Sequence, residues 1–497
     1  MNHTRLSVAL LTMAFAATGC STDLTGLNVN PNNPTSAPAS SLFTNATVTA
    51  MNRFNGSFQT LSMTSLFAQH IAQVQYVDED RGHIRTTTVD ALFTGVYTAE
   101  LKDFQQVIDI GKATTSPNTS GPASVMQTWV YQNLTDLFGD IPYSEALKGD
   151  AGGPLKPKYD LQKDIYAGML KSLTDASATM TASGGGVGAA DPIYQGDIAK
   201  WQRFSNSLRL RLAMRMQKAD AAKADVELRA ALSAPGGVFV SNADNAKLTW
   251  PGDGVFDNPW SANFGTRDDH RVAKTLLDTM LVLADPRVKI YAQPTKADPN
   301  IYAGLQNGLD NIIVTPFFNT TSRPGAIFYP GATSYGTYGT AAGKTTPSNI
   351  MTFAEVSFIL AEAAERNIGG LSGAAAYYTA GVRASIQQWG GTTAEADAYL
   401  LRAGVAYVPG ATGLRQIGLQ KWIALFTQGS EAWSEWRRTG NPATIKMGPR
   451  AYPDVLEVPR RIPYASNEQS VNAAKLSEAI ARQGPDTYST RMWWDKP

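Results

Sequence analysis

The stretch IMTFAEVSFILAEAAER, residues 350–366, decides the fold class that the sequence predicts. Its apolar residues recur at intervals of three and four positions, as they do on one face of an α-helix: Phe353, Val356, Leu360 and Ala364. The glycines at 369–370 end this helix, and a second helix is predicted over residues 374–389, with Ser372 as its N-cap and Gly390 just past its end. The two helices are expected to form an antiparallel hairpin, the unit of tetratricopeptide-like arrays.

Helical periodicity continues through most of the chain. Further helices are predicted over residues 40–54, 57–76, 88–110, 120–138, 161–180, 197–218, 269–283, 414–428, 431–439 and 467–482. Strand patterns are sparse, and residues 237–240 and 247–250 are expected to form a small hairpin. The predicted fold class is mainly α, with tetratricopeptide-like helix pairs forming a scaffold, a loop-rich half and little β structure.

Three arginines flank the apolar stripe of the helix predicted at residues 197–218: Arg209, Arg211 and Arg215. A guanidinium that is removed from water needs a carboxylate partner. We therefore expect these arginines to pair with acids of neighbouring helices, as structural groups rather than as ligand contacts.

The single cysteine of the 497 residues, Cys20, ends the sequence AATGC at residues 16–20. The apolar run before it, residues 6–17, is too short to span a bilayer and suits a signal peptide. The segment resembles a bacterial lipobox, although Ala17 stands where Leu is usual. We predict a lipoprotein signal peptide at residues 1–19 and lipid attachment at Cys20. The alternative is an ordinary secretory signal followed by an incidental thiol.

Residues 20–39 are rich in Asn, Pro, Thr and Ser, and are expected to form the lipid anchor and a flexible tether. Residues 40–497 are expected to form a single domain with an irregular, aromatic-rich insertion at about 285–348. Ser21 is compatible with the outer membrane. The residues themselves leave the leaflet open.

Composition and motifs exclude several classes of function. The 43 basic and 42 acidic side chains give a net charge of +1, which argues against a nucleic-acid partner. His70, His83 and His270 are far apart and form no zinc motif. GKTT at residues 343–346 lacks the glycine spacing and the following helix of a phosphate loop. No cofactor, metal or catalytic residue is expected, although the sequence leaves calcium binding by a loop open.

Several longer stretches occur in a fixed order along almost the whole chain. They are NVNPNNPT (28–35), LTDLFGDIPYSEAL (134–147), WQRFSNSLRLRLAMR (201–215), DPRVKIYAQP (285–294), YAGLQNGL (302–309), IMTFAEVSFILAEAAERN (350–367), QKWIALFTQGSEAWSEWRRTGNP (420–442) and VPRRIPYASNEQSVN (458–472). Together they resemble the SusD/RagB-like family of nutrient-binding outer-membrane lipoproteins, particularly its second SusD-like branch. The resemblance implies a mostly α-helical fold and a SusC-like TonB-dependent transporter as partner. It also implies the capture of glycans, or of peptides in some members, without catalysis.

The ligand contacts of this family vary between members, so candidate contacts are chosen here by composition. Exposed aromatic rings bordered by polar groups bind the C–H faces of sugars, and loops commonly carry such sites. The candidates in the aromatic loops are Tyr76, Trp260, Phe264, Arg267, Tyr329, Tyr335 and Tyr338, of which Trp260, Tyr335 and Tyr338 are the first to test. The alternative for each ring is that it packs its loop onto the helices.

The predicted function is the non-catalytic capture of an oligosaccharide or a peptide by an outer-membrane lipoprotein, which delivers it to a SusC-like TonB-dependent transporter. Two alternatives remain open. A surface glycoside hydrolase needs only two opposed carboxylates, which leave no signature in sequence spacing. A tetratricopeptide-like adaptor would instead bind a protein partner through a helical face. The identity of the ligand and the stoichiometry with the transporter are not determined by the sequence.

Overall fold

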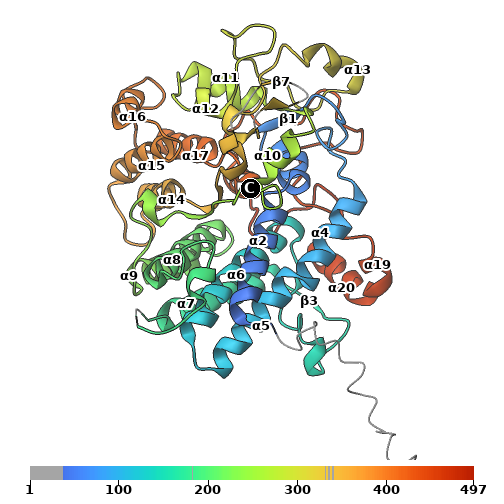
Figure 1. The fold of residues 1–497 in the computed structure, drawn as a ribbon, viewed down its shortest axis with the longest axis vertical. Coiled ribbons are helices and arrows are strands. Elements are labelled where there is room, and N and C mark those ends of the chain that lie inside the picture. Colours follow the sequence, from blue (N-terminus) through green and yellow to red (C-terminus); the bar gives the residue numbers. More distant parts are fainter. Residues whose placement is uncertain (1–36, 182, 331, 334–335, 338–340) are drawn as a thin grey trace, which may run out of the picture. The chain divides into compact units, whose positions relative to one another are not determined.

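The computed structural model describes residues 37–181, 183–330, 332–333, 336–337 and 341–497. The predicted signal peptide, Cys20 and most of the predicted tether lie outside the described residues. Residues Ala39–Pro497 form one compact unit. Figure 1 shows that helices make up most of this unit, which confirms the predicted mainly α fold class.

A series of long helices forms the first part of the unit. These helices are α2 (Ala39–Phe54), α4 (Thr86–Thr98), α5 (Glu100–Ala113), α6 (Pro117–Phe138), α7 (Gln162–Thr179), α8 (Ile198–Arg215) and α9 (Ala221–Ser233). The predicted helix at 88–110 is therefore two helices, because the chain leaves helical geometry at Ala99, where φ is −118° and ψ is −82°. Helix α9 was not predicted. Helices α2 and α4 both pack against α5, and from α5 to α9 each helix packs against the next.

The predicted hairpin at residues 350–389 is confirmed. Helix α14 (Phe353–Glu365) packs against α15 (Ala374–Gln388), and α8 packs against α14, so the hairpin continues the helical array. The N-cap of α15 is Gly373, with φ of 78°, and not Ser372. Glycine adopts this left-handed conformation readily, so the helix begins at Ala374 as predicted but with a different capping residue. The remaining helices of this part are α16 (Thr393–Leu400), α17 (Ala411–Ala424) and α18 (Gly429–Thr439).

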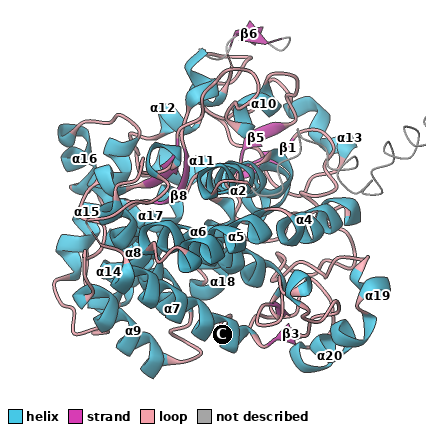
Figure 2. Ribbon diagram, turned by 60° about the horizontal axis from the view of Figure 1, so that its bottom comes forward, coloured by secondary structure: helices cyan, strands magenta, loops and turns pink. Residues whose placement is uncertain are grey.

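The strands are short and lie among loops and short helices (Figure 2). They pair as β1 (Ile71–Gln73) with β5 (His270–Val272), β2 (Ile141–Pro142) with β3 (Tyr159–Asp160), β4 (Ala246–Leu248) with β8 (Ser348–Met351), and β6 (Ala332–Thr333) with β7 (Gly336–Thr337). The predicted hairpin of residues 237–240 with 247–250 is wrong, because β4 finds its partner about a hundred residues further along the chain.

Two predicted helices contain strands of the loop-rich half. Residues 57–76 form the π-helix η2 (Ser57–Thr64), then α3 (Ser65–Phe67), and then β1. Residues 269–283 begin with β5, and helix α11 (Lys274–Val282) follows. In both segments the antiparallel pairing of β1 with β5 overrides the local helical periodicity.

Helix α20 (Ala473–Gln483) and several short helical turns complete the described chain. The short turns are α10 (Pro259–Phe264), α12 (Val288–Tyr291), α13 (Asn311–Val314), α19 (Glu468–Val471), and the 3-10 turns η3 (Gly149–Ala151), η4 (Gly188–Ala190), η5 (Asn242–Asp244), η6 (Thr315–Phe317), η7 (Ala326–Phe328) and η8 (Ala341–Thr345). The segment at 285–348 therefore contains only short elements, in agreement with the absence of a long helical pattern. Among the described residues, no helix combines the length and apolarity needed to cross a membrane.

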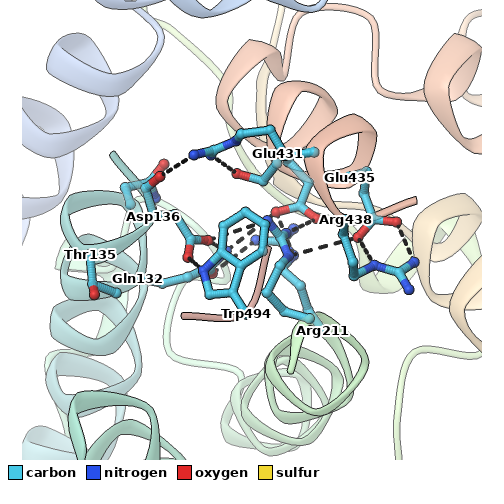
Figure 3. Close-up of polar contacts among 12 residues, drawn as sticks. Gln132, Thr135, Asp136, Arg211, Glu431, Glu435, Arg438 and Trp494 are labelled. Carbon is cyan, nitrogen blue, oxygen red and sulfur yellow. Dashed lines mark hydrogen bonds and ion pairs between the residues drawn. The ribbon is translucent and has the colours of Figure 1, made fainter. Parts of the chain in front are cut away.

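An ion-pair network in the interior joins α8 to its neighbours (Figure 3). Arg211 pairs with Glu355 of α14 at 2.6 Å, and Arg215 pairs with Glu431 of α18 at 2.5 Å. At the edge of the array Arg209 pairs with Glu227 of α9 at 2.7 Å. The predicted structural role of the three arginines is confirmed, since each meets a carboxylate of a neighbouring helix.

The network extends through α18 to α14 and α17. Arg438 contacts Glu362 of α14 at 2.5 Å and Glu435 at 2.8 Å, and Lys421 of α17 contacts Glu435 at 2.9 Å. All four side chains are buried. Because unpaired charges are very unfavourable in such an environment, the pairing fixes the relative positions of three helices beneath the loop-rich half.

Candidate functional site

The short helix α10 lies at the centre of the candidate site. Asn258 caps its first turn, because the side-chain oxygen accepts hydrogen bonds from the backbone N–H groups of Trp260 at 2.9 Å and Ser261 at 3.2 Å. Its side-chain amide donates to the carbonyl of Thr346 at 2.7 Å. The sequence Asn-Pro thus starts a helix that is tied at once to a segment almost ninety residues further on.

The inner side of α10 carries aromatic rings that pack into the core. Phe264 stacks on Tyr329 with ring centroids 4.6 Å apart, and Trp260 contacts Phe426 edge to face at 5.7 Å. Trp260, Phe264 and Tyr329 are each at most 3% exposed. Their rings offer no open face to a ligand, which differs from the expectation for these three candidates. They support the site from below, because burying apolar rings against one another stabilises the loops that carry them.

Tyr76 and Arg267 lie together at the surface. Tyr76 is 50% exposed, and the Arg267 guanidinium lies 5.0 Å from the centre of its ring, within the range of a cation–π contact. Arg267 also pairs through Nε with Asp269 at 2.6 Å. Tyr76 follows β1 and Arg267 precedes β5, so the antiparallel pairing of these strands brings the two side chains together. Arg267 is joined to the end of α10 as well, since its N–H donates to the carbonyl of Asn263 at 3.1 Å.

The other two candidates, Tyr335 and Tyr338, lie outside the described residues, and their role stays a prediction. The described segments that precede Tyr335 and follow Tyr338 in the sequence both contact α10. Tyr329 stacks on Phe264, and η8 contacts α10 directly.

The loop that carries Tyr76 is held in place by a buried acid, Asp80. Its carboxylate accepts hydrogen bonds from the Asn307 side-chain amide at 2.7 Å, the Gly308 N–H at 3.1 Å and the Gln73 N–H at 3.2 Å. Burial raises the pKa of Asp80 to about 7, although these donors favour the ionised form. Tyr76 itself has φ of 55°, a conformation that a tyrosine adopts rarely. The Asp80 contacts are therefore part of what keeps the ring in this position.

A depression of about 360 Å³ lies between the end of α2, η2 and α10. Its lining combines one exposed ring with amides and a paired arginine: Phe58, Asn52, Gln59, Asn263 and Arg53. Phe58 is 55% exposed, and Arg53 pairs with Glu100 at 2.6 Å. Within the part of the chain that the structure describes, the Asn263 side-chain amide nitrogen is buried and lacks a hydrogen-bond partner. This side of the site was not predicted, because residues 57–76 were predicted to form one helix and Phe58 was not among the candidates.

The acids near α10 are neutralised by arginines. Asp268 accepts from Arg271 at 2.9 Å and also pairs with Arg323, and all three side chains are buried. Asp269 pairs with Arg267. A glycosidase needs a proton donor and a second carboxylate facing each other across the substrate. Asp268 and Asp269 are instead committed to arginines, and Asp257, which precedes α10, pairs with Lys344 at 3.2 Å.

The histidines of the described chain do not assemble a metal site. Burial lowers the pKa of His70 and of His270 to about 3, so both imidazoles are neutral at physiological pH. His83 is partly exposed and pairs with Asp454 at 2.8 Å. Among the described residues, no group of three or more His, Cys, Asp or Glu side chains is arranged to hold a metal ion.

A larger groove, of about 760 Å³, lies among α4, α5, residues 142–157 and α19. Charged side chains such as Lys102, Asp109 and Asp150 line part of it. None of the described candidate residues lines this groove, so the aromatic candidates and this groove are separate features of the molecule.

The chain is similar to one protein family over most of its length. A family model, SusD-like_2, described as starch-binding and associating with the outer membrane, matches residues 31–465. No curated protein matches the chain.

Solved structures share the fold. A chitin-binding protein is 29% identical, with a TM-score of 0.80 over 93% of this chain and 100% of that chain. A SusD homolog from Bacteroides thetaiotaomicron is 25% identical, with a TM-score of 0.77 over 93% of this chain and 100% of that chain. A chitin-binding SusD homolog from Flavobacterium johnsoniae is 24% identical, with a TM-score of 0.79 over 91% of this chain and 98% of that chain, and it shows likeness of fold alone.

Proposed function

This chain belongs to the SusD-like family of starch-binding proteins that associate with the outer membrane, and on that premise we propose that it captures oligosaccharides without cleaving them. The proposed binding surface combines the pair of Tyr76 and Arg267 with the depression that contains Phe58. The two are linked through α10, because the backbone N–H of Arg267 donates to the carbonyl of Asn263, a residue that lines the depression. The observation that carries the proposal is the half-exposed Tyr76 ring, held by Arg267.

The chemistry of this surface suits a neutral sugar. A sugar ring presents C–H groups on its face and hydroxyls at its edge, so it pairs with an aromatic ring bordered by amides. Tyr76 and Phe58 supply exposed rings, while Asn52, Gln59 and Asn263 supply amides. Arg53 is already paired with Glu100. This lining favours an oligosaccharide over a charged peptide, and the chitin-binding description of one similar structure supports the same ligand class.

The proposal includes the context of the protein in the cell. We infer that a lipid on Cys20 holds the chain at the outer membrane, on the cell-surface side, and that residues 20–39 act as a tether. We further infer that the captured sugar passes to a SusC-like TonB-dependent transporter. Support comes from the N-terminal sequence and from the family resemblance, since the description of the family includes association with the outer membrane.

The absence of catalysis is part of the proposal as well. Near α10 the acids Asp268 and Asp269 are engaged by arginines, which favours binding over hydrolysis. The two alternatives make different predictions. A glycoside hydrolase would shorten the oligosaccharide during incubation, and a tetratricopeptide-like adaptor would bind a protein partner with no dependence on Tyr76.

Isothermal titration with chito- and malto-oligosaccharides tests the proposal, with product analysis of the same mixtures. We expect binding by the intact domain without any change in sugar length. We expect Tyr76→Ala to weaken binding about three- to tenfold, because an aromatic contact contributes roughly 0.5–1.5 kcal/mol. The matched control is Val282→Ala, an exposed apolar residue at the end of α11. Binding unaffected by Tyr76→Ala, or cleavage of the sugar, would contradict the proposal.

A further inference from the structure

The solvent-facing side of α2 is unusual for a surface helix. Its exposed residues are Ser41, Asn45 and Asn52, and Thr49 beside them is partly exposed. The helix contains no acid, and its one basic residue, Arg53, is paired with Glu100. Surface helices normally carry charged residues on their outer face. The outer face of α2 instead presents hydroxyl and amide groups.

Two depressions meet on this face. One is the depression of about 360 Å³ beside α10. The other, of about 570 Å³, follows the first turns of α2 and is bordered by residues 248–251 and Phe256. Thr49 lines both, so the two depressions are neighbours along α2, and we call them together the α2 groove. From Ser41 to Asn52 the helix rises about 16 Å at 1.5 Å per residue.

Each part of the α2 groove has an exposed aromatic ring. Phe58 lies at the α10 end, and Phe256, which is 47% exposed, lies in the other part. The loop that presents Phe256 is well organised. Asp253 accepts hydrogen bonds from the N–H groups of Val255 and Phe256 at 2.9 and 2.8 Å, and Asp257 pairs with Lys344 at 3.2 Å. An exposed ring on a loop held in this way is preorganised for contact.

We propose that the α2 groove binds the extension of a neutral oligosaccharide whose other end lies on Tyr76 and α10. The inference rests on the proposed function and deepens it, because it assigns a long, unbranched and uncharged ligand to the site. Because residues of α10 also line the groove, a sugar chain can run from α10 along α2. Phe58 and Phe256 provide ring contacts along it, and the hydroxyl and amide side chains of α2 provide hydrogen bonds between them.

The charges around the groove argue for this occupant. Arg53 is engaged by Glu100, and Lys344 is engaged by Asp257. A groove whose nearby cations are already paired offers little to an anionic peptide or to an acidic polysaccharide. A neutral sugar chain needs only hydroxyl and amide partners and aromatic faces, which this lining supplies.

The test compares ligand length. Chitobiose and chitohexaose, and in parallel maltose and maltohexaose, are titrated into the intact domain. We expect the hexasaccharide of the binding series to bind at least tenfold more tightly than the disaccharide. We expect Phe256→Ala to weaken hexasaccharide binding about three- to tenfold and to leave disaccharide binding unchanged, whereas Tyr76→Ala weakens both. Val282→Ala is again the control, and thermal melting confirms that each variant is folded.

A blocking variant gives an independent readout. Thr49→Arg places a long side chain where the two depressions join, and we expect it to reduce hexasaccharide affinity to the level of the disaccharide. Equal affinity for the two lengths in the wild type would overturn the inference while leaving the proposed function intact. Absence of binding at either length would reject the proposed function itself.

Discussion

Arg215 of α8 and Glu431 of α18 form a buried ion pair, with 2.5 Å between Nη2 and Oε1. The guanidinium also lies 3.4 Å from Asp136 of α6 and 5.2 Å from the centre of the Trp494 ring. One side chain therefore joins three helices and the C-terminal segment. The pairing raises the pKa of Arg215 above its ordinary value, so the charge is retained in the interior.

Removing this arginine should destabilise the fold strongly. Arg215→Met leaves Glu431 and Asp136 in the interior without a main partner, and we expect a loss of about 3–5 kcal/mol in the free energy of unfolding. Chemical denaturation measures it. Lys171→Met, which breaks the exposed pair with Asp175, is the control, and an exposed pair contributes only about 0–1 kcal/mol. Equal losses in the two variants would show that burial is not what makes the Arg215 network important.

Trp260 is expected to support the fold rather than to contact the ligand. Because its ring is buried against Phe264 and Phe426, we expect Trp260→Ala to lower the free energy of unfolding by about 3–5 kcal/mol. Tyr76→Ala, at a half-exposed ring, is expected to change stability far less. Denaturation curves of both variants are the measurement, and a fully stable Trp260→Ala protein with weakened sugar binding would contradict the assignment.

Arg267 is expected to act as a positioning residue for Tyr76. Arg267→Ala removes the cation–π contact and the pair with Asp269, and we expect oligosaccharide affinity to fall about two- to fivefold, as roughly 0.5–1 kcal/mol at an exposed site implies. Arg267→Lys should restore part of the loss, because the cation remains. Titration of both variants is compared with Arg229→Ala, which breaks an exposed pair on α9. If Arg267→Ala has no more effect than this control, the positioning role is excluded.

Asp80 gives the protein a predictable dependence on pH. Its pKa is about 7 when folded and near 3.9 when unfolded, so between these values the folded state binds the proton more tightly. The contribution of Asp80 to stability is therefore greatest below about pH 4 and is lost as pH rises toward 7. We expect the melting temperature of the wild type to fall relative to that of Asp80→Asn as the pH rises from about 4 to about 7. A difference that is constant with pH would contradict the raised pKa.

The helical half of the fold was predictable because its signals are local. The stripe of Phe353 and Leu360 and the glycines after it specify α14 and its turn without reference to the rest of the chain. The pairing of β1 with β5 joins residues about two hundred positions apart, and short strands have no strong local pattern, so both were predicted as helix. Helix α9 was missed although its sequence is compatible with a helix, which shows that weak amphipathic segments are easily overlooked.

The candidate site was predicted only in part. Composition located the aromatic loops but could not distinguish rings that face outward from rings that face inward. Tyr76 and Trp260 stand in similarly mixed sequences, yet one is half-exposed and the other buried, because burial depends on which distant ring packs against each. The Phe58 side of α10 depends on the π-helix η2, which interrupts the regular helical spacing. Sequence periodicity alone did not reveal that interruption.

The pairing of β1 with β5 also determines when, during synthesis, the Tyr76–Arg267 pair can form. Tyr76 follows β1 and Arg267 precedes β5, and every helix from α4 to α9 lies between these two residues in the sequence. A truncated polypeptide that stops before His270 can contain all of these helices and still lack the partner strand. During synthesis and export, the protein should therefore be able to bind its ligand only after the second half of the chain is present.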